Sequence, residues 1–140
     1  MSEFDPLQRF VDAQEPVYAQ ALAELQAGDK RSHWMWFVFP QIGGLGHSAP
    51  AQFYAIRGRE EADAYSRHPL LGARLRECTA AMLGWAGRRG AERILGPVDA
   101  VKFRSAMTLF EACADDPSPF SEAIEAFYGG ERDQATLERL

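Results

Sequence analysis

The chain has 140 residues, enough for one domain with a buried core and too few for two independent units. It is 46% hydrophobic and 25% charged with a net charge of −5, so it lacks the overall basic field that binds nucleic acid. No apolar run approaches the roughly 20 residues that cross a bilayer, and the acidic start has no signal-peptide pattern. We expect one cytoplasmic domain over residues 1–140, with neither nucleic acid nor membrane as a partner.

Helical patterning covers most of the chain and predicts a mainly α fold, a compact single-domain bundle of about seven helical segments. In chain order, the seven helices are one opened by Asp5-Pro6, a stripe over 18–25 stopped by Gly28, 50–56, 60–67, 70–85, 98–114, and one opened by Ser118-Pro119 and stopped by Gly129. Two shorter helical turns are expected over 91–95 and after the cap Asp133. The segment over 70–85 is expected to be the central buried helix.

Residues 28–50 break this pattern with an irregular segment rich in aromatic residues and glycine. It holds two of the three tryptophans and two of the three histidines, and residues 30–59 carry four bases and no acid. Glycine turns let backbone N–H groups approach an anion, and Ser48 is placed to cap a helix near Pro50. Ser32 is expected to cap a short helix over 34–39, with Trp34 or Trp36 as a flat wall for a base or sugar.

This segment therefore suits a phosphate-bearing or otherwise anionic small ligand, to which Gln41 and the glycines Gly44 and Gly46 would contribute. The structural alternative is that six consecutive apolar residues at 34–39 simply belong to the core and the glycines form an ordinary turn. Under that alternative at least half of the six are buried.

A second candidate lies on the helix over 98–114, where Lys102 and Ser105 are three positions apart and Thr108 lies close to the same face. Lys102 would reach a ligand with Ser105 beside it. The alternative is an exposed lysine and two hydroxyls bonded to their own helix. Thirteen of the fifteen basic residues are arginine, and Lys30 and Lys102 are the two lysines. A lysine retained in such a chain suits a place where the arginine fork does not fit, so we predict that both lysines approach one site.

Several strings resemble the DUF1810 family over nearly the whole chain. They are Gly28–Gln41, which contains His-Trp-Met-Trp-Phe-Val-Phe-Pro, Gly44-Leu-Gly46 with Ser48, His68–Gly72, Gly96–Asp99 with Lys102, Ser105–Phe110, Phe4–Gln14 and Asp133–Leu137. The resemblance implies a mainly helical domain and no known function. Some members carry the label calpastatin, which the ordered-core composition of this chain argues against.

No known metal, cofactor or nucleophile motif is present. The three histidines have no metal-ligand spacing, Cys78 and Cys113 fit helical faces as reduced thiols, and neither a phosphate-binding loop nor a dinucleotide fingerprint occurs. We therefore expect no cofactor and no metal.

The remaining hypothesis is a pocket for a small anionic or nucleotide-like molecule, built from residues 30–48 and the face of Lys102, Ser105 and Thr108. If the protein is a hydrolytic enzyme, acting for instance on a nucleotide or ADP-ribose derivative, His33 would serve as acid–base group, with Lys30 or Lys102 stabilising negative charge. The competing hypothesis is a non-catalytic interaction module that grips a partner protein through Trp34 and Trp36. A concave cavity favours the first hypothesis and a flat exposed patch the second.

Overall fold

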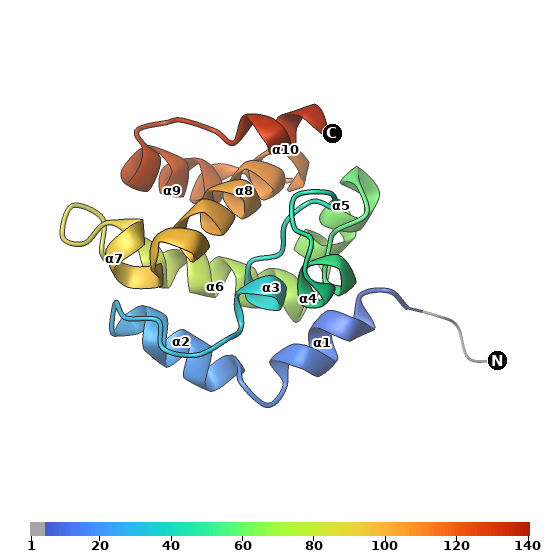
Figure 1. Ribbon diagram of the computed structural model, residues 1–140, viewed down its shortest axis with the longest axis horizontal. Coiled ribbons are helices and arrows are strands. Elements are labelled where there is room, and N and C mark those ends of the chain that lie inside the picture. The colour runs from blue at the N-terminus through green and yellow to red at the C-terminus, as the bar shows by residue number, and fades with distance from the viewer. Residues whose placement is uncertain (1–4) are drawn as a thin grey trace.

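The computed structural model describes residues 5–140, which form ten helices and no strand (Figure 1). In chain order they are α1 (Gln8–Gln14), α2 (Tyr18–Gln26), α3 (Met35–Val38), α4 (Ala49–Phe53), α5 (Arg59–Arg67), α6 (Leu71–Leu83), α7 (Ala91–Leu95), α8 (Pro97–Cys113), α9 (Ser118–Tyr128) and α10 (Gln134–Glu138). The predicted mainly α class is confirmed. Phe4, with which the family-like string Phe4–Gln14 begins, lies outside the described residues.

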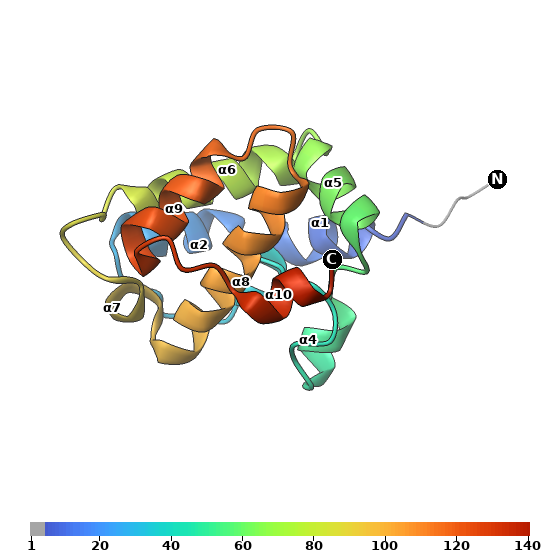
Figure 2. The ribbon, with the colours of Figure 1, turned by 90° about the horizontal axis from the view of Figure 1, so that it is seen from above.

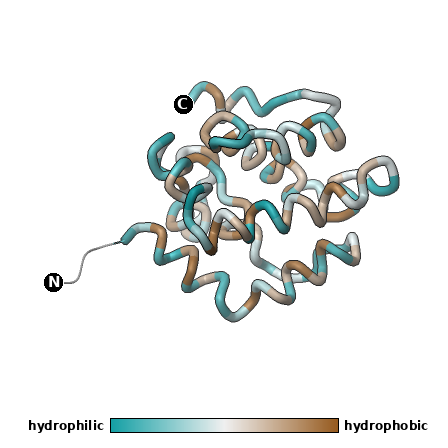
Figure 3. Tube along the Cα trace, turned by 180° about the vertical axis from the view of Figure 1, so that it is seen from behind, coloured by the Kyte–Doolittle hydropathy of each residue, from teal (hydrophilic) through white to brown (hydrophobic). Residues whose placement is uncertain are grey.

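The helices stack in layers. In the view of Figure 1, α1 and α2 lie below, α6 and the short α3 form the middle, and α8 and α9 lie above. Helix α8 packs against α5, α7, α9 and α10, whereas α6 packs against α2, α3, α5 and α9. Seen from above, α4 projects from the edge of the bundle (Figure 2). Hydrophobic and hydrophilic stretches alternate along the helices (Figure 3), as expected of elements that bury one face.

Helices α6 and α8 both run through the core, and the expected buried stripe over residues 70–85 is found in α6. All six residues from Ser105 to Phe110 are buried, so α8 has no solvent-facing side over this stretch. Helix α6 buries mainly one stripe, made by Leu71, Leu75, Cys78 and Met82. Amphipathic spacing predicts the buried stripe of α6, whereas the burial of α8 on all sides over residues 105–110 depends on tertiary contacts that spacing in one segment does not report.

Several predicted helix ends are confirmed by their capping bonds. The side chain of Ser48 accepts a hydrogen bond from the Ala51 N–H at 3.2 Å, and Asp133 caps α10 through the Thr136 N–H. Gly129 ends α9 in the left-handed conformation. Asp5 accepts a bond from the Leu7 N–H, but this turn precedes α1, which begins at Gln8.

The apolar run before Pro40 is mostly core. Trp34, Met35, Phe37, Val38 and Phe39 are buried, so five of its six residues pack inside, and α3 lies between α1 and α6. The chain after Pro40 leaves the core and returns at Ile56, which pairs with Ile42 in a single parallel bridge. Gly43 N–H donates to the Ile56 carbonyl at 2.8 Å and Ile56 N–H to the Gln41 carbonyl at 2.9 Å. Residues 43–55 therefore form a loop closed at its base, with α4 at its far side.

Within residues 5–140, no helix has both the length and the apolar character that a bilayer crossing requires.

Candidate functional site

The two lysines meet at one carboxylate. Lys30 Nζ lies 2.9 Å from Oδ2 of Asp99, and Lys102 Nζ lies 3.8 Å from Oδ1 of the same residue. Asp99 stands in the first turn of α8, three positions before Lys102, while Lys30 enters from the loop after α2. The predicted approach of the two lysines to one site is confirmed, and the residue that joins them is an acid to which sequence reasoning had given no role.

The two lysines are held very differently. The Lys30 ammonium also donates to the Ser32 carbonyl at 2.6 Å and lies 5.0 Å from the ring centroid of Trp34, and its side chain is 8% exposed. Lys102 lies 5.1 Å from the centroid of the Trp36 ring and is 24% exposed. Lys30 is therefore fixed within the fold, whereas Lys102 has a looser ion pair and access to solvent.

Glu24 of α2, which the sequence did not single out, organises the loop that carries Lys30. Its carboxylate accepts hydrogen bonds from the backbone N–H groups of Arg31 and Ser32, from the Ser32 hydroxyl and from Nε1 of Trp34 at 2.9 Å. Burial on its own would raise the pKa of Glu24, but these hydrogen bonds outweigh it and lower the pKa to about 2. The group is thus a carboxylate at any ordinary pH and a fixed anchor for the aromatic segment.

This anchor changes the roles expected of two candidates. The Ser32 hydroxyl donates to Glu24 and does not cap α3, whose N-cap residue is Trp34 and has no side-chain capping bond. Trp34 is 1% exposed, with its N–H bonded to Glu24, so it cannot be a wall for a ligand. The Ser32 hydroxyl and the Trp34 N–H, which were expected to face a ligand, are both bonded to Glu24.

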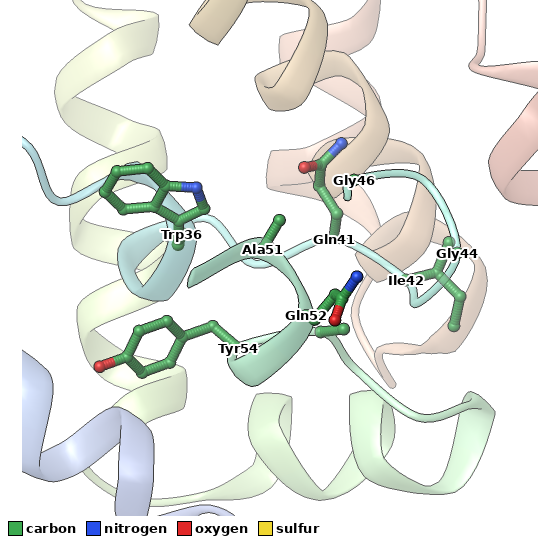
Figure 4. A pocket seen from close by; sticks show the side chains of 9 residues that line it. Trp36, Gln41, Ile42, Gly44, Gly46, Ala51, Gln52 and Tyr54 are labelled. Atoms are coloured by element: carbon green, nitrogen blue, oxygen red, sulfur yellow. The ribbon is translucent and has the colours of Figure 1, made fainter. Parts of the chain in front are cut away.

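An inner cavity of about 190 Å³ opens beside the loop of residues 43–55 (Figure 4). Trp36 and Tyr54 lie to one side of it, and the amides of Gln41 and Gln52 lie to the other. Its full lining is Trp36, Gln41, Ile42, Gly44, Gly46, Ala51, Gln52, Tyr54 and Ala55. We call this space the inner cavity.

A wider hollow of about 580 Å³ adjoins it and shares Gln41, Gly46 and Ala51 with it. Its other lining residues come from the loop and from the first two turns of α8, and they are Leu45, His47, Ser48, Pro97, Val98, Val101 and Lys102. We call this space the outer groove. Lys102 is the charged group of its lining and places a cation on the α8 wall, while Gln41, His47 and Ser48 are the other polar side chains of a mainly apolar lining.

Gly44 and Gly46 of the loop occupy positions where a side chain would not fit. Gly44 has φ +96°, and a Cβ on it would lie 2.8 Å from Nε of Arg139. A Cβ on Gly46 would lie 2.6 Å from the Cβ of Ala51. The cavity therefore owes its shape to the absence of side chains at both positions.

One polar atom on this wall has no partner. Nε1 of Trp36 is buried and makes no hydrogen bond to any of the described residues. Buried N–H groups nearly always have a partner, so an orphan on a cavity wall indicates where an acceptor atom from outside the chain would sit. Figure 4 shows the indole nitrogen on the side of the ring that faces Ala51 and Gln41.

Ser105 and Thr108 do not join Lys102. The Ser105 hydroxyl donates to the Val101 carbonyl and to Oδ2 of Asp133 at 2.9 Å, and Thr108 donates to the Arg104 carbonyl while accepting from the Asp133 N–H at 3.0 Å. Both are buried. These hydroxyls bond to their own helix, as in the structural alternative, and they also attach α10 to α8.

His33 is exposed and lines neither the inner cavity nor the outer groove. The structure therefore does not bring the proposed acid–base group together with Lys102 there. Cys78 is buried and Cys113 half-buried, both as free thiols, and burial raises the pKa of each. Of the twelve predicted site residues, half line the two hollows: Trp36, Gln41, Gly44, Gly46, Ser48 and Lys102.

The largest hollow, about 1210 Å³ between α1 and α4, contains none of the predicted site residues. Of the two cations in its lining, Arg9 is already paired with Glu61 at 2.9 Å and donates to the carbonyls of Phe53 and Ala55, and Arg57 is exposed. We therefore place the candidate site at the inner cavity and the outer groove.

Comparison with known proteins gives a family and a fold. Residues 4–140 match the DUF1810 model, described as a protein of unknown function. A crystal structure described as the conserved hypothetical protein Rv1873 from Mycobacterium tuberculosis is similar at 48% sequence identity and a TM-score of 0.93, covering 97% of this chain and 98% of that one. No curated protein matches the chain.

Proposed function

Because this chain belongs to the DUF1810 family, whose description names no activity, we propose from its own geometry that it binds a small anionic molecule across the inner cavity and the outer groove. The observation that carries the proposal is the buried, unpartnered Nε1 of Trp36 on the cavity wall. The Lys102 ammonium lies over the face of the same indole ring. A free N–H donor and a neighbouring ammonium suit a ligand that brings both a hydrogen-bond acceptor and a negative charge.

The balance of charge around Asp99 supports this assignment. Lys30 and Lys102 carry two positive charges against one negative charge on Asp99, so the cluster has a net charge of +1. Lys30 pairs with Asp99 at 2.9 Å, whereas Lys102 lies 3.8 Å away. Lys102 can therefore turn toward a second anion while Asp99 keeps its ion pair with Lys30. The chain as a whole has a net charge of −5, which disfavours large polyanions and fits a small ligand.

The competing function, a docking module built on Trp34 and Trp36, loses one of its two anchors because Trp34 is 1% exposed. Catalysis by His33 has no support from the lining of either hollow. The function that the geometry supports best is therefore binding, and the nucleotide-like character of the ligand and any hydrolytic step belong to further tests.

Thermal unfolding in the presence of inorganic phosphate and citrate tests the proposal, since a ligand of the folded state raises the Tm with concentration. We expect these anions to raise the Tm of the wild type. In Lys102→Met, which keeps the aliphatic packing over Trp36, the same anions should raise the Tm much less. Arg93→Gln is the matched control, because Arg93 is an exposed cation on α7 outside both hollows. Equal gains in the wild type and Lys102→Met, or no gain with any anion, would overturn the proposal.

A further inference from the structure

The two hollows differ in chemistry, and the difference points to a ligand with two unlike parts. The inner cavity has the rings of Trp36 and Tyr54 on one side and two amides on the other (Figure 4). The outer groove has the cation of Lys102. The two spaces meet at Gln41, Gly46 and Ala51, so one molecule can occupy both.

The size of the inner cavity limits what enters it. A space of about 190 Å³ is slightly larger than the roughly 150 Å³ cavity that holds a benzene molecule, so it is on the scale of a single six-membered ring. The outer groove, at about 580 Å³, is within the usual range for small-molecule sites and has room for a sugar and a phosphate.

The polar atoms of the inner cavity fit a ring that both donates and accepts hydrogen bonds. Nε1 of Trp36 is a donor without a partner, and the amide of Gln41 offers a donor and an acceptor at the junction of the two spaces. The amide nitrogen of Gln52 is used by the His47 carbonyl at 3.1 Å, which holds that side chain in place. A pyrimidine with carbonyl oxygens and a ring N–H complements this set, and its faces suit aromatic walls.

We infer that the ligand carries one planar heterocyclic ring in the inner cavity and one anionic group beside Lys102 in the outer groove, as a pyrimidine nucleoside monophosphate does. The inference rests on the proposed function, since it names the chemical class of the anion bound there. Trp36 is the specificity-determining residue, because its N–H donates to the ring of the ligand and the face of its indole lies under Lys102.

Titration calorimetry of the full chain with four probes tests the inference: uridine 5′-monophosphate, adenosine 5′-monophosphate, uridine and inorganic phosphate. We expect the uridine monophosphate to bind at least about tenfold more tightly than phosphate, and more tightly than the adenosine monophosphate. Trp36→Phe keeps an aromatic wall and removes the N–H. This substitution should weaken the binding of uridine monophosphate about five- to tenfold and leave the binding of phosphate unchanged, whereas Lys102→Met should weaken the binding of both.

The outcomes separate this inference from the proposed function. If phosphate binds through Lys102 and the ring adds nothing, or the two-ring nucleotide binds as well as the one-ring nucleotide, the inference is overturned and the proposed function stands. If neither phosphate nor either nucleotide binds, both fall. Each variant is first compared with the wild type by its Tm without ligand, and Trp36→Tyr replaces Trp36→Phe if the latter does not fold.

Discussion

Nε1 of Trp34 lies 2.9 Å from Oε1 of Glu24, so a carboxylate on α2 fixes the orientation of the largest fully buried side chain in the aromatic segment. The same carboxylate collects the backbone N–H groups of Arg31 and Ser32. Through Glu24, α2 thus determines the path of the loop that places Lys30 against Asp99. The consequence is that a residue remote from the inner cavity controls the geometry of the site.

Replacing Glu24 with glutamine should remove much of the acid sensitivity of the fold. The folded-state pKa of Glu24, about 2, lies below the ordinary value of 4.5, so its contribution to stability is present above pH 4.5 and is lost as the pH falls toward 2. That contribution is roughly 3 kcal/mol, by the conversion of 1.36 kcal/mol for each pKa unit. Urea unfolding at pH 7 and pH 3 should show a smaller pH dependence in Glu24→Gln, together with a loss of about 2–3 kcal/mol at pH 7. A pH dependence equal to that of the wild type would contradict this role.

Lys30 and Lys102 should differ in their effect on stability. Lys30→Met removes the close partner of Asp99 and leaves a carboxylate that is 18% exposed with one loose ion pair, which should cost about 2–4 kcal/mol. Lys102→Met breaks a 3.8 Å contact at a more exposed position and should cost less than about 1 kcal/mol. Chemical denaturation of both variants measures the difference. Similar losses for the two would show that Asp99 does not depend mainly on Lys30.

Asp133→Ala should loosen α10 without unfolding the bundle. Its Oδ2 accepts from the hydroxyl of Ser105 and from Thr136, and its N–H donates to Thr108, so the side chain both caps α10 and attaches it to α8. We expect a loss of about 1–2 kcal/mol and faster amide exchange within residues 134–138. Asp116→Ala is the control, because Asp116 accepts from Ser118 on an exposed turn and joins no second helix. Equal exchange rates in the two variants would contradict the attachment.

Two glycines should respond in opposite directions to alanine. A Cβ on Gly72 would lie 2.1 Å from the backbone carbonyl oxygen of Ser66, and backbone cannot move aside as a flexible side chain does. Gly72→Ala should therefore cost at least about 2 kcal/mol. Gly90 has φ −77° and nothing within 4 Å of an added Cβ, so Gly90→Ala should be neutral or stabilise by up to about 1 kcal/mol. Thermal unfolding separates the two, and a neutral Gly72→Ala would be the contrary result.

Local sequence signals predict where helices end, but they do not predict which residues far apart in the sequence come into contact. Ser48 and Asp133 could be recognised as caps because a capping bond spans three residues. The short α3 is different: Trp34 and Trp36 are two positions apart, and only the fold decides that one is buried against Glu24 while the other lines the inner cavity.

The partners of polar residues were the least predictable part of the site. Glu24 looked like one more acid in a helix, because four of its five donors come from a loop that the sequence places seven to ten residues later. Ser105 and Thr108 share a helix with Lys102, but burial directs them to Asp133. The composition clue of two lysines among fifteen basic residues did lead to one location, since both ammonium groups need the same carboxylate.

The paired backbones at Ile42 and Ile56 have an evolutionary consequence. Because the chain departs from the core and returns at adjacent points, residues 43–55 can change in length or composition while the two ends stay where they are. Most of the inner cavity is lined from this closed loop, whereas Lys102 and Trp36 are supplied by the helical framework. Descendants of this fold can thus acquire new ligand preferences through one surface insertion, with the cation and the indole inherited unchanged.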